Sequence, residues 1–220
     1  MTRTCVVVQW VLRVLVLGPL FRLRDRPVVV GSDAIPRRGP LILVANHQAV
    51  SDSFHLAIAA RRPVVFLAKA EYFTETGLRG RMKQWFFRSI GQIPVDRDGG
   101  DAASDALSTA GAVVASGAAW AVHPEGSRVT SHSIHRGHTG ALRVAIATGA
   151  PVVPLAITGT ADGEHWWSRR DVTIHVGDVF DPTGLTPDDA REAIDRLMRW
   201  MADATGWPYV DSYTPRRGAA

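Results

Sequence analysis

Residues 41–52 read Leu-Ile-Leu-Val-Ala-Asn-His-Gln-Ala-Val-Ser-Asp, and they decide how the rest of the chain is interpreted. The first five residues are apolar, which indicates a buried strand. The apolar run ends abruptly at Asn46 and His47, and a polar turn leads from there to Asp52. A second apolar run follows, so the stretch predicts a strand, a turn and a helix in that order.

His47 and Asp52 are the candidate catalytic pair. The carboxyl end of a parallel strand is the place where open α/β sheets bind their ligands. If the chain turns back at Asp52, its carboxylate reaches the His47 imidazole and fixes the tautomer, which leaves the other ring nitrogen free as a base. A satisfied surface histidine and an ordinary helix-capping Asp explain this stretch equally well, so the choice depends on the rest of the chain.

Apolar runs and helical patterns alternate along the sequence. Strands are predicted at residues 28–30, 41–45, 64–67, 90–95, 119–122, 152–157 and 172–176. Helices are predicted at residues 53–60, 70–87, 101–116, 139–148 and 186–206. This alternation predicts an α/β fold with a mixed, mostly parallel sheet flanked by helices. With 220 residues and 46% hydrophobic content, we expect one domain over residues 27–206 and a C-terminal tail over residues 207–220.

Residues 1–26 differ from the rest of the chain. Residues 4–21 are mostly apolar, and three arginines follow between residues 22 and 26. Arg13 interrupts the apolar run, and an arginine at the bilayer centre costs roughly 2.5–3.5 kcal/mol on insertion scales. We therefore expect a membrane-associated N-terminal helix that lies in the interface, with the arginines at anionic headgroups. A helix packed on the domain is the alternative.

Composition narrows the partners and the compartment. The formal net charge of +4 and the isoelectric point of about 9.8 suit a phospholipid surface, a phosphorylated substrate, an acidic carrier protein or a nucleic acid. Cys5 is the lone cysteine, which excludes an intramolecular disulfide and a cysteine-based zinc site. A reducing compartment is the expectation that follows.

Two more strand ends carry charged residues. Residues 91–97 read Gly-Gln-Ile-Pro-Val-Asp-Arg, and the guanidinium fork of Arg97 suits a phosphate. Residues 122–128 read Val-His-Pro-Glu-Gly-Ser-Arg, where a tight turn follows an apolar strand and holds Glu125 and Arg128 beside it. In a parallel sheet both arginines lie near His47, although ordinary surface charge pairs would have the same sequence.

These blocks together resemble the glycerolipid acyltransferase family, typified by 1-acylglycerol-3-phosphate acyltransferases. The resemblance covers about residues 40–160 and rests on Asn46-His47 with Asp52, Ala68–Phe73, Gly91–Arg97, Pro124–Arg128 and Val153–Ile157. Four positions depart from the family pattern: Ala49 stands where Ser is usual, His123 where an aromatic or aliphatic residue precedes the Pro, Ser127 where Thr is common, and His138 where Lys is frequent.

The resemblance implies a function and a role for each candidate residue. His47 would be the general base and Asp52 its orienting partner, while the acceptor would be bound, or its pocket shaped, by Arg97, Glu125, Gly126, Ser127 and Arg128. The implied reaction transfers an acyl group from acyl-CoA or acyl carrier protein to a lysophospholipid hydroxyl, with 1-acyl-sn-glycerol 3-phosphate as the leading acceptor and phosphatidic acid as the product. No metal, cofactor or nucleic acid is implied, and the expected location is the cytoplasmic face of the cell membrane, as a peripheral or monotopic protein.

Several alternatives stay open at this stage. An acyltransferase acting on another lipid hydroxyl would carry the same motifs. A serine hydrolase of the α/β-hydrolase class would need a Gly-x-Ser-x-Gly turn, which the sequence lacks. A metal enzyme could use His132, His135 and His138, with His47 or Asp52 completing the ligand set. A non-enzymatic basic module that binds membrane surfaces or nucleic acid would explain the charge and the N-terminal segment, but not the paired histidine and aspartate.

Overall fold

The computed structural model describes residues 11, 15, 18–89, 92–95, 102–161 and 168–215, and within these residues the chain forms a seven-stranded sheet. The strands lie in the order β1-β8-β7-β2-β5-β3-β4. Their bounds are β1 Val28–Val30, β2 Leu41–Ala45, β3 Val64–Lys69, β4 Ile93–Val95, β5 Ala119–Val122, β7 Val152–Thr158 and β8 Thr173–Val176. β7 and β8 are antiparallel and the other neighbours are parallel, so the prediction of a mixed, mostly parallel sheet is confirmed.

Strand β2 lies at the centre of the sheet and is buried on both faces. Ile42 and Val44 belong to one hydrophobic cluster, while Leu41, Leu43 and Ala45 belong to the other. Successive side chains of a strand point to opposite faces, so a strand covered on both sides needs apolar residues at every position. This explains the uninterrupted apolar run that precedes Asn46.

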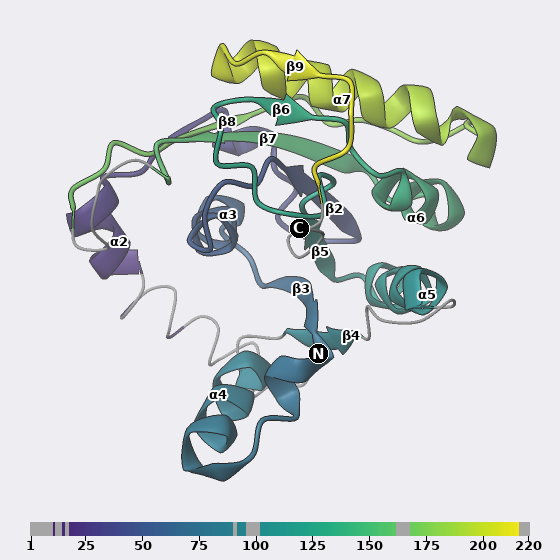
Figure 1. Ribbon diagram of the computed structural model, residues 1–220. Helices are drawn as coiled ribbons and strands as arrows, with labels where there is room; N and C mark the ends of the chain where they lie inside the picture. Colours follow the sequence, from purple (N-terminus) through teal and green to yellow (C-terminus); the bar gives the residue numbers. More distant parts are fainter. Residues whose placement is uncertain are drawn as a thin grey trace.

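Helices cover the two faces of the sheet unequally (Figure 1). Helices α5 (Ala102–Ala115), α6 (Gly140–Thr148) and α7 (Ala190–Thr205) bury their apolar residues in the cluster that contains Ile42. Helix α3 (Asp52–Ala60) packs on the opposite face, beside α2 (Gly18–Asp25). Because α3 begins directly after the β2 turn, its first residue, Asp52, lies at the carboxyl edge of the sheet.

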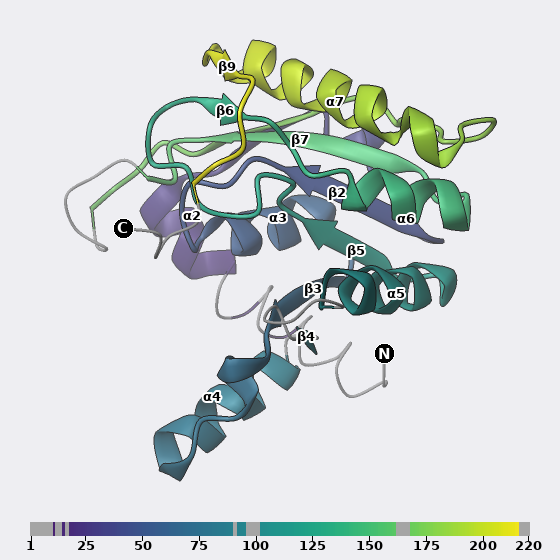
Figure 2. The same cartoon turned by 45° about the vertical axis from the view of Figure 1, so that its right-hand side comes forward.

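The helix predicted at residues 70–87 is divided in the structure. A short 3-10 turn, η3 (Ala70–Phe73), comes first, and α4 (Gly77–Ser89) follows. Gly77 has a φ of +82°, which belongs to the left-handed region and interrupts a right-handed helix. Helix α4 projects away from the body of the molecule in both ribbon views (Figures 1 and 2).

The C-terminal part folds back over the domain. Thr186 caps the helix predicted at residues 186–206. Its N–H donates to Asp189 Oδ2 at 2.7 Å ahead of the 3-10 turn η4 (Pro187–Asp189) and α7. After α7, β9 (Tyr209–Val210) pairs in parallel with β6 (Ile134–His135). Neither short strand was predicted, and β9 lies within the segment expected to be a tail.

Helix α2 is the described end of the N-terminal segment. Most of the apolar run at residues 4–21, where the interfacial helix is expected, lies outside the described residues. Helix α2 continues through the arginine-rich flank to Asp25. It lies against α3, where Phe21 stacks on Phe54 with ring centroids 5.6 Å apart.

Candidate active site

Asn46 lies directly after β2 and before His47, and its side chain binds the neighbouring strand β7. Its side-chain N–H donates to the carbonyl oxygen of Ile157 at 2.8 Å, and its oxygen accepts the Ile157 N–H at 2.7 Å. The Asn46 side chain therefore makes the two hydrogen bonds that a neighbouring backbone would make, and it connects the end of β2 to β7. Asn46 is buried, so both polar groups of its side chain need these partners.

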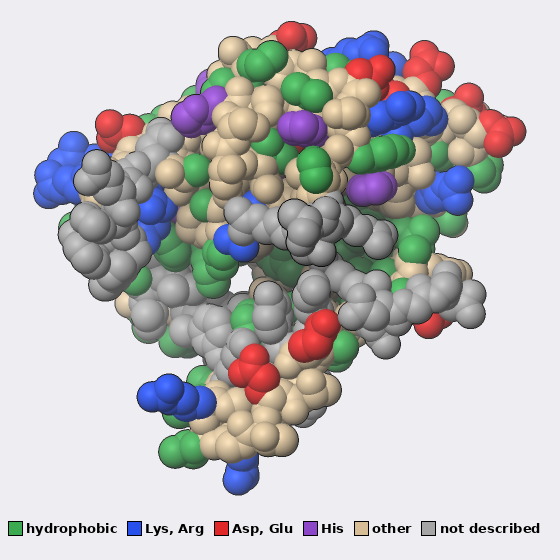
Figure 3. Space-filling view, viewed as in Figure 1, with side chains coloured by type: hydrophobic (Ala, Val, Ile, Leu, Met, Phe, Trp, Pro, Cys, Tyr) green, Lys and Arg blue, Asp and Glu red, His purple; other side chains and the backbone are tan. Residues whose placement is uncertain are grey.

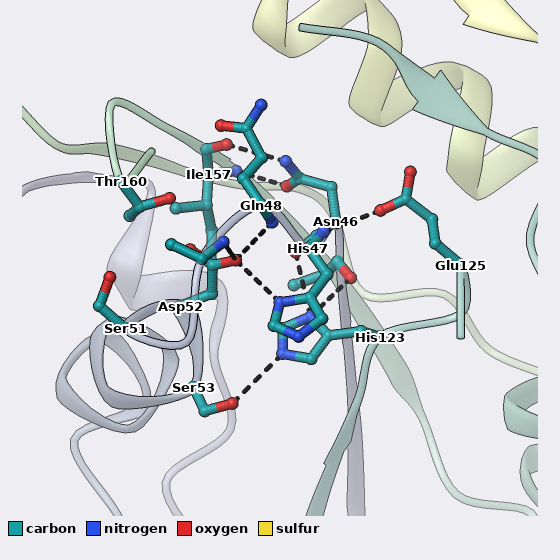
Figure 4. A network of polar contacts seen from close by, with 12 residues as sticks. Asn46, His47, Gln48, Ser51, Asp52, Ser53, His123, Glu125, Ile157 and Thr160 are labelled. Carbon is teal, nitrogen blue, oxygen red and sulfur yellow. Dashed lines mark hydrogen bonds and ion pairs between the residues drawn. The ribbon is translucent and has the colours of Figure 1, made fainter. Parts of the chain in front are cut away.

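His47 and Asp52 form the pair that the sequence predicts. Nδ1 of His47 lies 2.9 Å from Oδ2 of Asp52 (Figure 4). An ionised carboxylate only accepts, so Nδ1 carries the proton and Nε2 keeps its lone pair. No described residue forms a hydrogen bond with Nε2. The arrangement gives a fixed tautomer with one nitrogen available as a base.

Asp52 is held ionised in a buried position. The same Oδ2 also accepts the backbone N–H groups of Gln48 and Ala49 at 2.6 and 2.8 Å. Burial raises the pKa of Asp52, but the hydrogen bonds from the His47 side chain and the Ala49 backbone oppose this, so its pKa lies below the ordinary value. The first turn of α3 favours a negative charge at this position as well.

Glu125 binds two backbone segments. Oε2 accepts the N–H of His47 at 2.8 Å, and Oε1 accepts the N–H of His135 at 2.9 Å. The side chain is only 1% exposed, and burial raises its pKa to about 7 although both hydrogen bonds oppose the rise. Of the two roles that the family resemblance implies, this geometry supports shaping the pocket, because both carboxylate oxygens already have partners.

The turn after Glu125 runs beside His47. Gly126 has a φ of +76°, and a Cβ there would lie 3.2 Å from the His138 ring, so both conformation and space favour glycine. The Val129 N–H donates to the carbonyl oxygen of His47 at 2.7 Å. Ser127 and Arg128, both half-buried, lie between these two contacts. The structure thus brings residues 125–128 next to the His47–Asp52 pair.

Arg128 and Arg97 are the two predicted phosphate ligands. Within the described part of the chain, Arg128 has no hydrogen-bond or ion-pair partner, so its guanidinium is available to an anion. Arg97 falls in residues 96–101, which lie outside the described residues, and its role stays a prediction.

Histidines at positions 132, 135 and 138 do not form a ligand set. The His132 ring contacts Trp207, Nδ1 of His135 lies 3.2 Å from the Ser212 carbonyl oxygen, and the His138 ring stacks on Tyr213. Among the described residues, no group of three His, Cys, Asp or Glu side chains is placed to hold a metal ion. The alternative of a metal enzyme built on these histidines has no geometric support.

The fold and the site define an α/β enzyme whose His-Asp pair lies at the carboxyl edge of the sheet. The family model for acyltransferases matches residues 26–158. This span includes the site residues Asn46, His47, Asp52, Glu125 and Arg128. The chain therefore belongs to the acyltransferase family and is an acyltransferase. The matched region contains the block from Asn46 to Asp52.

Similar proteins agree with this assignment. A probable 1-acyl-sn-glycerol-3-phosphate acyltransferase of Mycoplasma genitalium is 33% identical over an alignment of 193 residues, and the match covers 80% of this chain and 70% of that protein. The chloroplastic 1-acyl-sn-glycerol-3-phosphate acyltransferase BAT2 of Brassica napus is 28% identical over 121 residues, 55% of this chain and 33% of that protein. The crystal structure of the Thermotoga maritima 1-acyl-sn-glycerophosphate acyltransferase has the same fold, with a TM-score of 0.65, 24% identity and coverage of 86% of this chain and 79% of that chain.

Proposed function

We propose that this enzyme transfers an acyl group from acyl-CoA or acyl carrier protein to 1-acyl-sn-glycerol 3-phosphate and so forms phosphatidic acid. The observation that carries the proposal is the His47–Asp52 pair, 2.9 Å apart, with Nε2 of His47 unbonded to any described residue. The names of the Mycoplasma and Brassica relatives support the same acceptor.

The chemistry needs only one base. Nε2 of His47 takes the proton of the acceptor hydroxyl while that oxygen attacks the thioester carbonyl carbon. A carbon–oxygen bond forms, the carbon–sulfur bond breaks, and the leaving thiolate takes the proton from the imidazolium. Asp52 stabilises the imidazolium during this step and keeps the ring in its tautomer.

Arg128 supplies the proposed contact to the acceptor phosphate. A guanidinium fork and a phosphate form paired, charge-assisted hydrogen bonds. Arg128 immediately precedes Val129, whose N–H is bonded to the His47 carbonyl oxygen at 2.7 Å. A phosphate bound here would hold the glycerol backbone of the acceptor close to the base, and Arg97 would assist as the family resemblance implies.

Because the proposed acceptor is a lipid, we propose that the enzyme binds to a membrane surface. The proposed side is the cytoplasmic face. On α2, Leu20 and Leu23 are 51% and 76% exposed and flank the exposed Arg22. On α4, the side chains at i, i+4 and i+7, Leu78, Met82 and Trp85, are 77%, 64% and 66% exposed. Apolar side chains beside arginines suit an anionic headgroup layer.

The shape of the molecule is compatible with this surface. Helix α4 projects from the body, and hydrophobic and basic side chains appear at its outer end (Figure 3). In the described part of the chain, no helix is long and apolar enough to cross a membrane. We propose attachment at the surface of the bilayer through the exposed apolar and basic side chains of α2 and α4.

The test is a thioester-consumption assay with the mass of the product measured. The donors are acyl-CoA and the acyl thioester of acyl carrier protein. The acceptors are 1-acyl-sn-glycerol 3-phosphate, 1-acylglycerol, a lysophosphatidylcholine and glycerol 3-phosphate. We expect the highest kcat/KM with 1-acyl-sn-glycerol 3-phosphate and a product with the mass of phosphatidic acid. His47→Ala is the blank for thioester hydrolysis. A higher kcat/KM for any other acceptor would contradict the proposed substrate.

A further inference from the structure

A second imidazole lies against the catalytic one. His123 follows β5 directly, and its ring stacks on the His47 ring with centroids 4.0 Å apart and 9° between the planes. Figure 4 shows the two rings one over the other. The sequence identifies His123 only as a departure from the family pattern and assigns it no role in the reaction.

Both nitrogens of His123 have partners. Nδ1 lies 3.0 Å from the carbonyl oxygens of Ala45 and Asn46, at the end of β2. Carbonyl oxygens only accept, so Nδ1 carries the proton. Nε2 then accepts from the hydroxyl of Ser53, whose Oγ lies 3.4 Å away. His123 therefore offers no nitrogen to a substrate, in contrast to His47.

His123 is neutral at physiological pH. Burial lowers its pKa to about 4, and the His47 imidazole acts in the same direction. The carboxylate of Asp52 and the two carbonyl groups act in the opposite direction. His47 and Asp52 are the titratable groups that act on it, because the other contacts come from carbonyls and a hydroxyl.

We infer that His123 is a positioning residue, whose Nδ1–H anchors its ring to the end of β2 so that the ring face fixes the plane of the His47 imidazole. The hydrogen bond to Asp52 holds one atom of the His47 ring and leaves rotation about that contact. The stack removes this rotation and directs Nε2 of His47 at the acceptor hydroxyl. A neutral aromatic face also attracts the imidazolium that forms when His47 takes the proton.

Two substitutions separate the ring face from the anchor. His123→Phe keeps a flat ring and loses both nitrogens, while His123→Asn keeps a side-chain N–H donor and loses the ring. The matched control is His132→Phe, in the loop before β6, where the ring contacts Trp207 with centroids 5.2 Å apart. This control makes the same exchange at a histidine outside the His47, Asp52 and His123 cluster.

The kinetic expectation, which rests on the proposed acyl transfer, is a loss in kcat without a loss in binding. Small misplacements of a reacting group cost up to about 10²-fold in rate, so we expect His123→Asn to lower kcat about tenfold or more. The ring that remains in His123→Phe should restore most of this, to within about threefold of wild type. The KM values for donor and acceptor should stay within about twofold, because the inferred role of His123 is to orient the His47 ring and not to bind a substrate.

The tautomer is measured without any substrate. In protein labelled with ¹⁵N-histidine, the signals that disappear in His123→Phe should be those of a neutral ring protonated at Nδ1 from about pH 5.5 to about pH 8. A charged ring, or a ring protonated at Nε2, would overturn the anchor, and the loss of signals in His123→Asn gives the same assignment if His123→Phe does not fold.

The kinetic outcomes decide the role of the ring face. Wild-type kcat in His123→Asn, or equal losses in His123→Phe and His123→Asn, would overturn it. An increase in KM that accounts for the whole loss would do the same. If the wild type acylates a different acceptor, the proposed substrate fails, but these ratios to wild type and the ¹⁵N measurement still decide the inference.

Discussion

Oδ2 of Asp25 lies 3.0 Å from Nε2 of His55, and neither side chain is exposed to solvent. The guanidinium of Arg24 binds the same carboxylate through Nε and Nη2, both at 2.5 Å. On its other side, Nδ1 of His55 lies 2.9 Å from the carbonyl oxygen of Ser51, the residue before Asp52. Helix α2 is thereby connected to the first turn of α3, where the catalytic carboxylate lies.

Removal of Asp25 should destabilise the protein strongly. Asp25 is buried and bonded to Arg24, and its removal leaves both Arg24 and the buried His55 without this partner, which typically costs about 1–3 kcal/mol. We therefore expect Asp25→Ala to lower the free energy of unfolding by about that amount in urea titrations. Asp33→Ala, at an exposed carboxylate in the 3-10 turn η2 (Ser32–Ala34), is the control and should have little effect. Similar unfolding midpoints for the two variants would contradict the prediction.

A truncation that tests membrane attachment must end before Gly18. Deletion of residues 2–17 removes most of the apolar run but leaves α2 and Asp25 in place. This variant should bind anionic vesicles more weakly in sedimentation assays and keep activity on a short-chain, water-soluble acceptor. Deletion of residues 2–26 should lose both vesicle binding and activity on the soluble acceptor, because His55 then lacks its partner Asp25. Equal activity of the two truncated proteins on the soluble acceptor would show that Asp25 is dispensable.

The catalytic pair gives the most direct prediction. His47→Ala should lower kcat by about 10²–10⁴-fold, the usual contribution of a positioned base, with the fold intact by circular dichroism. Asp52→Asn should also lower kcat, since an amide can donate to Nδ1 and favour the wrong tautomer. The thioester assay measures both effects. Turnover near wild type in purified His47→Ala protein would exclude His47 as the base.

Much of the fold could be predicted because its signals are local. The apolar runs of β2, β5 and β7 are strands that helices cover on both faces, and each has a short, uninterrupted hydrophobic sequence. The break before α4 was missed, because the pattern over residues 70–87 continues through Gly77, and only the backbone shows its left-handed conformation.

The site could be predicted in part for a related reason. His47 and Asp52 are five residues apart, so their motif is visible in the sequence. Asn46 and Ile157 are 111 residues apart, and Glu125 joins His47 to His135 through backbone groups that any residue would carry. Contacts of this kind have no local pattern. The stack of His123 on His47 is also long-range, although the unusual histidine before Pro124 is a visible signal.

Glu125 should make stability depend on pH. Its pKa is raised from the ordinary 4.5 to about 7 in the folded protein, so between these values the folded state binds a proton that the unfolded state has released. This contribution to stability is fully present below about pH 4.5 and is lost as the pH rises to about 7, by about 3 kcal/mol in total. Urea unfolding across this pH range should show that the free energy of unfolding of the wild type falls with rising pH, and that this decrease is absent from Glu125→Gln. Parallel curves for wild type and Glu125→Gln would contradict the assignment.

Arg128 should determine the preference for a phosphorylated acceptor. Hydrogen bonds to a charged group are worth about 1.5–3 kcal/mol, so Arg128→Ala should lower kcat/KM for 1-acyl-sn-glycerol 3-phosphate roughly 10- to 150-fold. Arg128→Lys should restore little, because an ammonium group does not reproduce the paired contact of the guanidinium. Arg143→Ala is the control, because it removes the same charge at an exposed position of α6.

The comparison of acceptors gives the Arg128 prediction its specificity. With 1-acylglycerol, which has no phosphate, Arg128→Ala and wild type should differ little, and the KM for the thioester donor should be unchanged. The three variants are therefore assayed with both acceptors at matched ionic strength, since salt screens general charge effects. An equal loss with both acceptors would mean that Arg128 supports the turn around Glu125 and that the phosphate is bound by another group, with Arg97 the first to substitute.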